Sequence, residues 1–214
     1  MEKKYELVKE DIIKISNNHT LYRIRALKDF NDVKKGDLGG YIEKEENLSN
    51  EGNCWIYNNA KVYNNAKVYD DAEVYGYAKV RGNAIVYSNA KVYDNAIVCG
   101  NARVCDDAEV CDDAEVCGNA EVYGNARVYN NARVWGNAYI SSNNDYALVQ
   151  GFGSSNRSTT FFKCKDNHIH VICGCFSGTL EEFEFKVKQT HGDNKYGREY
   201  LNIINTIKIH FELE

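Results

Sequence analysis

The sequence predicts a mainly β protein whose central part is a parallel β-helix. Alanine recurs at every sixth position from 60 to 138, and valine or isoleucine follows two residues after each alanine. A pair of turn-forming residues, mostly Asn, Asp or Gly, precedes almost every alanine. An amphipathic α-helix would repeat its apolar residues with a period of 3.6, so a period of six indicates a short strand followed by a corner.

Each hexapeptide alternates between an inward and an outward face. In a strand such as Ala-Lys-Val, the first and third side chains share one face and the second takes the other. We therefore expect alanine and valine to point inward, and Lys61, Glu73 and Arg103 to point to solvent. Corner pairs such as Gly82-Asn83 suit positive φ or tight local turns at low cost.

Fifteen hexapeptides run from residue 51 to residue 140, because Cys54 and Ile56 extend the register backwards by one repeat. Three hexapeptides make a triangular coil of 18 residues, so the repeats predict about five coils. A single coil cannot offset the entropy of ordering its backbone, and the coils must therefore stack cooperatively. The pattern resembles the hexapeptide-repeat family of left-handed parallel β-helices, and this resemblance implies the left hand.

Residues 18 apart should stack on one outer face. One such ladder alternates in charge, through Glu73, Lys91, Glu109 and Arg127. A second ladder is less regular: Lys61, Lys79, Ile97, Glu115 and Arg133. Opposite charges about 5 Å apart favour pairing of neighbouring strands. We interpret both ladders as solvated charged faces.

Eight cysteines occur, without a CxxC pair of the kind that binds zinc. Four of them replace the tyrosine that usually follows each valine: Cys99, Cys105, Cys111 and Cys117. Only Cys99 and Cys117 should share a face, so the four thiols cannot converge on one metal ion. We expect reduced thiols that act as small apolar residues in a cytoplasmic protein.

Residues 1–50 are predicted to form a β cap, with strands near 4–8 and 20–27 and a glycine turn at 35–40. An open β-helix end would expose unpaired backbone, and a cap would cover it. The stretch 21–57, LYRIRALKDFNDVKKGDLGGYIEKEENLSNEGNCWIY, resembles the lead-in of phage and bacterial hexapeptide-repeat proteins of the YdcK-like group.

Residues 141–214 lack the period of six and predict a small α+β domain. Three strands are expected at 146–150, 159–165 and 168–176, with a hairpin turn at Asp166-Asn167. Two helices follow: the first starts in a capping box of Thr179 and Glu182, and the second spans about 196–211. The segments TTFFKCKD, CGCFSGTLEEF and THGDNKYGREYL resemble a module that ends several phage-type repeat proteins.

Polar residues of this last segment are the candidate ligand-binding residues: Ser154, Asn156, Arg157, Thr159, Cys175, His191, Asp193 and Arg198. Arg157, on a predicted Gly/Ser loop, suits a carboxylate or a phosphate. Cys175 and His191 could form a nucleophilic pair, but no sequence motif supports that pairing. His168 and His170 share a strand face but supply only two ligands, so we expect neither a metal nor a cofactor.

The composition argues against several classes of partner. The net charge is −5, and the negative excess lies mostly in the repeats. The sequence therefore offers no basic surface of the kind that binds nucleic acid. The sequence contains no run of about 18 apolar residues, so we expect no membrane span. Residues 1–10 alternate charged and apolar side chains and do not resemble a signal peptide.

Many β-helix proteins of this family are acyltransferases that carry a histidine base on or near the coils of a trimer. Residues 51–140 contain no histidine and no loop insertion, which argues against that activity. We therefore favour a non-catalytic, phage-type binding or scaffold protein, oligomeric and by analogy trimeric. Its C-terminal domain would recognise a small polar or anionic ligand or a host protein. An acyltransferase-like enzyme is the alternative, and an acidic mimic of DNA ranks third.

Overall fold

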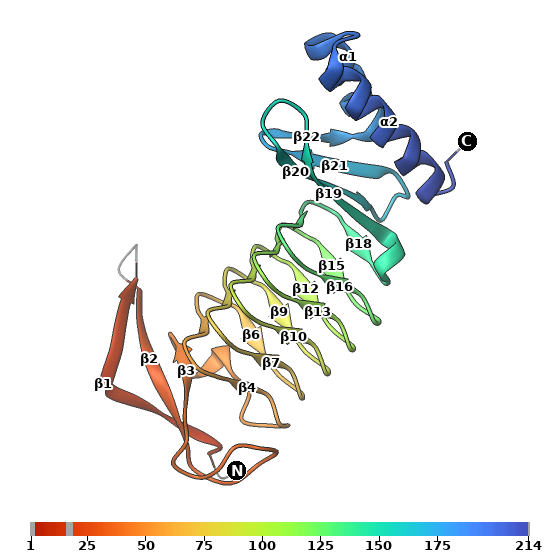
Figure 1. The fold of residues 1–214 in the computed structure, drawn as a ribbon. Helices are drawn as coiled ribbons and strands as arrows, with labels where there is room; N and C mark the ends of the chain where they lie inside the picture. Colours follow the sequence, from red (N-terminus) through yellow and green to blue (C-terminus); the bar gives the residue numbers. More distant parts are fainter. Residues whose placement is uncertain (1–2, 16–18, 214) are drawn as a thin grey trace.

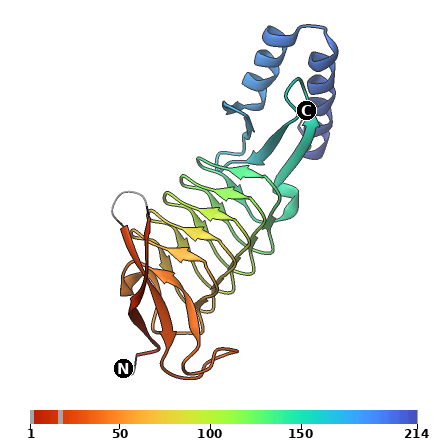
Figure 2. The ribbon, with the colours of Figure 1, turned by 60° about the vertical axis from the view of Figure 1, so that its left-hand side comes forward.

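The computed structural model describes residues 3–15 and 19–213, which form three parts in a row (Figure 1). An antiparallel strand pair lies at one end of a parallel β-solenoid, and a sheet with two helices lies at the other end (Figures 1 and 2). The predicted fold class, a mainly β protein with a parallel β-helix and a small C-terminal α+β region, is therefore confirmed.

Two-residue strands recur every six residues along the three faces of the solenoid. They are β4 (Trp55–Ile56), β5 (Lys61–Val62), β6 (Lys67–Val68), β7 (Glu73–Val74), β8 (Lys79–Val80), β9 (Ile85–Val86), β10 (Lys91–Val92), β11 (Ile97–Val98), β12 (Arg103–Val104), β13 (Glu109–Val110), β14 (Glu115–Val116), β15 (Glu121–Val122), β16 (Arg127–Val128), β17 (Arg133–Val134) and β18 (Tyr139–Ile140). Strands one coil apart pair in parallel, so that Val80 lies between Val62 and Val98.

The interior is filled by the alanines and valines of the repeats, as predicted. Between Ala60 and Val134 each of them is 1% exposed or less. The first residue of each corner pair has positive φ, as at Asp106 (58°) and Gly100 (71°). A Cβ on Gly100 would lie 2.8 Å from the backbone nitrogen of Gly118 in the next coil, so glycine suits this close stacking of corners.

The solenoid has about six turns rather than five. Strand β3 (Leu38–Ile42) pairs in parallel with β5, and Leu48 forms a parallel bridge to Val68. Together with β4 these residues make a first coil that begins before residue 51. Its repeat is degenerate, because Glu46 stands at an alanine position and the step from Leu48 to Ile56 is two residues too long.

The N-terminal segment extends one sheet of the solenoid. Strands β1 (Tyr5–Ile15) and β2 (His19–Ala26) are antiparallel, and β2 also pairs with β3. The side chain of Lys4 is buried and donates a hydrogen bond to the carbonyl of Cys54, 2.9 Å away. Burial lowers the pKa of Lys4. This ammonium group satisfies carbonyls at the corner of the first coil, which is the role expected of a cap.

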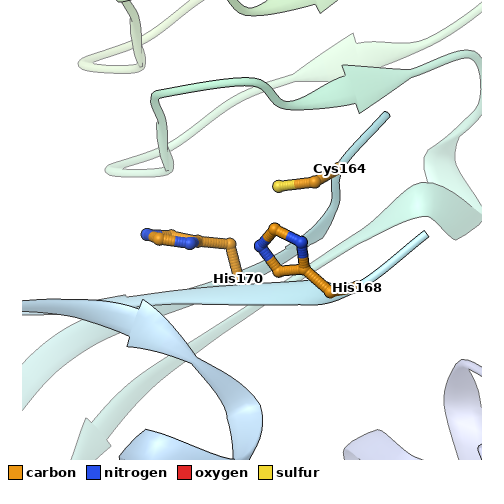
Figure 3. Close-up of side chains that lie close together, drawn as sticks. All are labelled: Cys164, His168 and His170. Atoms are coloured by element: carbon orange, nitrogen blue, oxygen red, sulfur yellow. The ribbon is translucent and has the colours of Figure 1, made fainter. Parts of the chain in front are cut away.

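The C-terminal sheet has four strands rather than the three predicted. They are β19 (Tyr146–Phe152), β20 (Arg157–Lys163), β21 (Ile169–Cys173) and β22 (Phe176–Thr179), antiparallel in this order. The predicted third strand is interrupted at Gly174, whose φ of 61° allows a tight turn between β21 and β22. The turn at Asp166-Asn167 is confirmed, and Figure 3 shows side chains of this hairpin.

Helices α1 (Leu180–His191) and α2 (Lys195–His210) cover one face of this sheet, and the capping box of Thr179 and Glu182 is confirmed. Phe161 of β20 packs against the helices, whereas its neighbour Phe162 joins the core that is continuous with the solenoid. The sheet thus covers the last coil. None of the described helices has the length and apolar character needed to cross a membrane.

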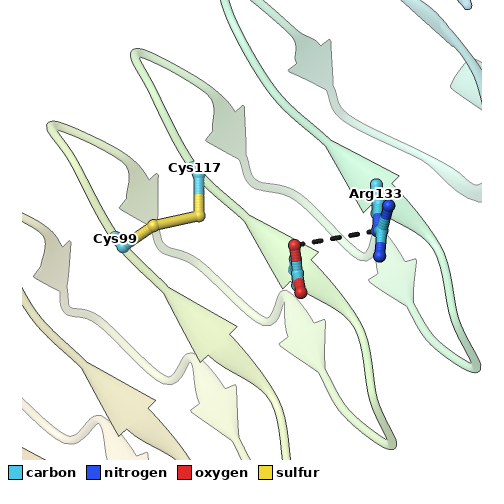
Figure 4. The surroundings of a disulfide bond; sticks show 4 residues. Cys99, Cys117 and Arg133 are labelled. Carbon is cyan, nitrogen blue, oxygen red and sulfur yellow. Dashed lines mark ion pairs between the residues drawn. A yellow bond between two sulfur atoms is a disulfide. The ribbon is translucent and has the colours of Figure 1, made fainter. Parts of the chain in front are cut away.

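Neighbouring opposite charges form ion pairs along the outer ladders, for example Arg127 with Glu109, whose nitrogen and oxygen are 3.4 Å apart. Cys99 and Cys117 share a face on consecutive coils, as predicted (Figure 4). They form a disulfide, so the expectation that all eight cysteines are thiols is wrong for this pair. The stacking of coils brings their Cα atoms to 4.6 Å, which is within disulfide range.

Candidate functional site: a cationic cleft in the C-terminal region

A cleft of about 180 Å³ lies where the β19–β20 loop, the β21–β22 turn and the two helices meet. We call it the Arg157 cleft. It is lined by Ser154, Ser155, Arg157, Cys173, Cys175, Phe176, Phe183, Lys186, Val187, Thr190, His191 and Tyr200. Strands supply one wall of the cleft and helices supply the other, so most of its lining stands on regular secondary structure.

Two tight turns set the position of Arg157. This residue begins β20, directly after the turn that contains Gly153. A Cβ on Gly174 would lie 2.4 Å from Nη1 of Arg157, so the guanidinium group lies directly over a glycine. A Cβ on Gly153 would lie 2.2 Å from the hydroxyl of Tyr200. Both close approaches depend on glycine, which also tolerates the positive φ at these positions.

The floor of the cleft is a chain of polar contacts between buried and partly buried groups. The hydroxyl of Thr159 donates to the Cys173 sulfur at 3.1 Å, and that sulfur lies 3.7 Å from the Tyr200 hydroxyl. Burial, together with the hydrogen bond to Cys173, raises the pKa of Tyr200 to about 12. The phenol is therefore neutral near pH 7 and retains its proton.

His191 closes the cleft from the end of α1. Its ring stacks on Tyr200, with centroids 5.9 Å apart and planes inclined by 27°. Cys175 is exposed in the β21–β22 turn. Cys175 and His191 both line the cleft, but among the described residues no hydrogen bond joins the sulfur to the imidazole, so the geometry gives no support to a nucleophilic pair.

The lining of the cleft combines apolar side chains with cations, hydroxyls and two cysteines, and it includes no carboxylate. Its cationic side chains are Arg157 and Lys186, and the imidazole of His191 lies beside them. Within residues 3–15 and 19–213, the guanidinium of Arg157 makes no ion pair with a carboxylate. Glu199 is near, but its Oε2 accepts from the backbone nitrogen of Gly153 at 3.1 Å and its Oε1 lies 3.6 Å from Lys195. An anion in the cleft would meet the positive charge of Arg157 and Lys186, whereas Asp113 and Glu115 line a neighbouring groove that Arg157 also borders.

Comparison with known proteins shows a similarity over a short stretch of the chain. No family model matches the chain. A stretch of 41 residues is 54% identical to a protein of Escherichia coli (strain K12) named "Uncharacterized acetyltransferase YdcK". The stretch is 19% of this chain and 13% of that protein, so the chain spans about an eighth of the relative's length. The similarity and the solenoid together support a hexapeptide-repeat β-helix.

The structure brings four of the eight candidate residues together in the cleft: Ser154, Arg157, Cys175 and His191. Thr159 lies beneath the cleft, 3% exposed, and holds Cys173. Arg157 itself lies at the start of a strand rather than on the predicted loop.

Asn156, Asp193 and Arg198 do not line the cleft. Asn156 has a φ of 48° and completes the β19–β20 turn. The carbonyl of Asp193 accepts a hydrogen bond of 2.7 Å from Nη1 of Arg198, which stabilises the connection between the helices. These three residues therefore have turn and helix-end roles in the structure.

Sequence reasoning missed Lys186 and Tyr200, which also line the cleft. Phe183, Lys186, Val187 and Thr190 follow the helical spacing of three and four residues, so they share one face of α1. That periodicity was visible in the sequence. The place of Tyr200 was not, because it depends on how α2 packs against α1.

Proposed function

We propose that this chain is a non-catalytic binding protein whose Arg157 cleft holds a small anionic ligand. The observation that carries the proposal is the convergence of Arg157, Lys186 and His191 on a cleft without a carboxylate. The solenoid would serve as a rigid spacer and as the core of an oligomer, with a trimer favoured by analogy. The phage-type origin and a host protein as partner remain parts of this proposal.

The proposal is tested by calorimetric titration with inorganic phosphate, acetate and adenosine monophosphate. A hydrogen bond to a charged group contributes about 1.5–3 kcal/mol, so Arg157→Ala should weaken binding about 10- to 100-fold. Arg198→Ala is the matched control, because Arg198 is exposed and lies outside the cleft. The proposal fails if no anion binds the wild type or if both variants weaken binding equally.

A cytoplasmic location also belongs to this proposal. The Cys99–Cys117 disulfide is the observation against it, since stable disulfides are rare in the reducing cytosol.

A second candidate function is acyl transfer, and the observation that favours it is a histidine–carboxylate pair beside the first coils. Nδ1 of His19 lies 2.6 Å from Oε1 of Glu43, and the ring is 6.0 Å from that of Tyr63. Burial raises the pKa of Glu43, but hydrogen bonds from His19 and Asn64 outweigh it and hold the pKa below its usual value. An ionised Glu43 would hold Nδ1–H of His19 and leave Nε2 as a base.

Release of coenzyme A from acetyl-CoA, measured with amine and sugar acceptors, tests this second candidate. We expect His19→Gln to abolish turnover, because the amide cannot act as a base near pH 7. His210→Gln, at the exposed end of α2, is the matched control and should retain turnover. Absence of turnover in the wild type with every acceptor, or turnover that persists in His19→Gln, rules the candidate out.

A further inference from the structure

Three side chains that favour transition metals meet at the hairpin between β20 and β21. Cys164 stands just before the hairpin turn, His168 just after it, and His170 two residues further along β21. One ligand atom from each of the three lies within 4.8 Å of the other two. Figure 3 shows the ring of His168 directed toward the sulfur of Cys164, with the ring of His170 beside it.

Hydrogen bonds orient both imidazoles. Nδ1 of His168 lies 2.5 Å from Oδ1 of Asp166, and Nε2 of His170 lies 2.8 Å from Oγ of Ser177. One nitrogen of each ring is thereby engaged. Within residues 3–15 and 19–213, no hydrogen bond engages Nε2 of His168 or Nδ1 of His170. A carboxylate or hydroxyl on the second nitrogen is the arrangement that orients histidine ligands in metal sites.

The surroundings of the cluster are closed on one side and open on the other. Cys164 is 3% exposed and forms an antiparallel bridge to Ala138 of the last coil. The next residue, Lys165, donates its backbone N–H to the carbonyl of Asn137 at 3.1 Å. The side chain of His168, in contrast, is 34% exposed. The last coil of the solenoid therefore covers the Cys164 sulfur on one side, and the imidazoles are accessible to solvent on the other.

We propose that Cys164, His168 and His170 bind one divalent transition-metal ion, Zn²⁺ above all, and leave a fourth position open to water. One thiolate and two neutral imidazoles form the mixed S/N set that suits zinc, whereas magnesium and calcium require oxygen ligands. Zinc bonds of about 2.0–2.3 Å place the ligand atoms of one tetrahedral ion about 3.3–3.8 Å apart. The three ligand atoms lie within 4.8 Å of one another, which suits one shared ion after a small adjustment. On binding, the Cys164 thiol releases its proton to solvent and its sulfur bonds to the metal. No atom changes its oxidation state. The site is separate from the Arg157 cleft and does not depend on the proposed function.

Cobalt(II) is the probe that tests the site, because its thiolate complexes absorb in the near-ultraviolet and its tetrahedral complexes absorb in the visible range. The full chain, freed of metal with a chelator, is titrated with Co²⁺ and then with Zn²⁺. We expect one Co²⁺ per chain with a thiolate band, displaced by Zn²⁺. His168→Ala should remove tight binding. Asp166→Asn, which changes only a positioning residue, should weaken it about 10- to 100-fold.

Variants elsewhere in the chain separate this site from other thiols and carboxylates. Cys164→Ser should lose the thiolate band, whereas Cys175→Ser and Cys105→Ser, at free cysteines outside the cluster, should keep it. Asp193→Asn, at an exposed turn, should bind Co²⁺ as the wild type does. If Cys164→Ser fails to fold, the variant of the partly exposed His168 still decides whether the site binds a metal. A wild type without a thiolate band, or a band and affinity unchanged in His168→Ala, overturns the proposal.

Discussion

At the scale of single residues, the solenoid depends on small apolar side chains whose neighbours lie one coil above and below. Val110 is fully buried, and it pairs in register with Val92 and with Val128. Corner residues add side-chain ladders of their own. The amide of Asn83 donates to Asn101 at 3.0 Å, and Asn101 donates in turn to Asn119 at 3.0 Å. Each residue position is thus supported by the same position in the next coil.

Val110→Asp should unfold the solenoid or lower its free energy of unfolding by about 4 kcal/mol or more, because it buries a carboxylate without a partner in the middle of the stack. The measurement is the urea midpoint followed by circular dichroism. Ile97→Asp places the same group at an outward, partly exposed position and should cost far less. An unchanged midpoint in Val110→Asp would contradict the inward orientation of valine.

At the scale of elements, a short corner joins the solenoid to the C-terminal sheet. Oδ2 of Asp145 accepts hydrogen bonds from the backbone nitrogens of Ser141 and Ser142, both at 2.9 Å. Its Oδ1 lies 3.0 Å from Nζ of Lys163 in β20. Burial would raise the pKa of Asp145, but the hydrogen bonds from Ser141 and Lys163 outweigh it and lower the pKa to about 2. The folded state therefore favours the ionised carboxylate.

Asp145→Asn should destabilise the protein at pH 7, and the deficit relative to wild type should shrink in acid. The folded pKa is below the ordinary value of 3.8, so the carboxylate stabilises the fold above that value. Its contribution is lost as the pH falls from 3.8 toward about 2. Urea denaturation of both proteins across this range measures the difference. Asp193→Asn, an exposed control, should follow the wild type. A deficit that stays constant with pH would contradict the role given to Asp145.

At the scale of the whole molecule, both ends of the solenoid are covered. Strands β1 and β2 extend one sheet at the N-terminal end, and Lys4 satisfies carbonyls of the first coil. At the other end, Phe162 and Ile172 of the C-terminal sheet join the solenoid core. Exposed strand edges promote association with other chains, and these covers reduce that exposure. The candidate sites are also separated. His19 begins β2 at one end of the solenoid, whereas the Arg157 cleft and the Cys164 cluster belong to the C-terminal sheet and helices at the other end.

Much of this architecture could be predicted from the sequence, because the repeat is local. A strand of two residues and a corner of the same kind recur in each hexapeptide, so the inward positions, the charge ladders and the shared face of Cys99 with Cys117 all followed from counting. The first coil was missed because Glu46 and the longer step to Ile56 interrupt the period. The break at Gly174 was missed because a glycine within a strand pattern is compatible with either a strand or a turn.

The sequence alone thus determined the solenoid and the direction of its side chains, since these depend on neighbours at fixed spacings along the chain. Only the tertiary structure decided which polar groups converge. Arg157 meets His191 because α1 packs across the sheet, and Cys164 meets two histidines because the hairpin folds back on itself. The Cys99–Cys117 disulfide also depends on the tertiary structure, because it requires the actual separation of two consecutive coils. These contacts join residues from different elements, and they depend on packing between those elements rather than on any local pattern.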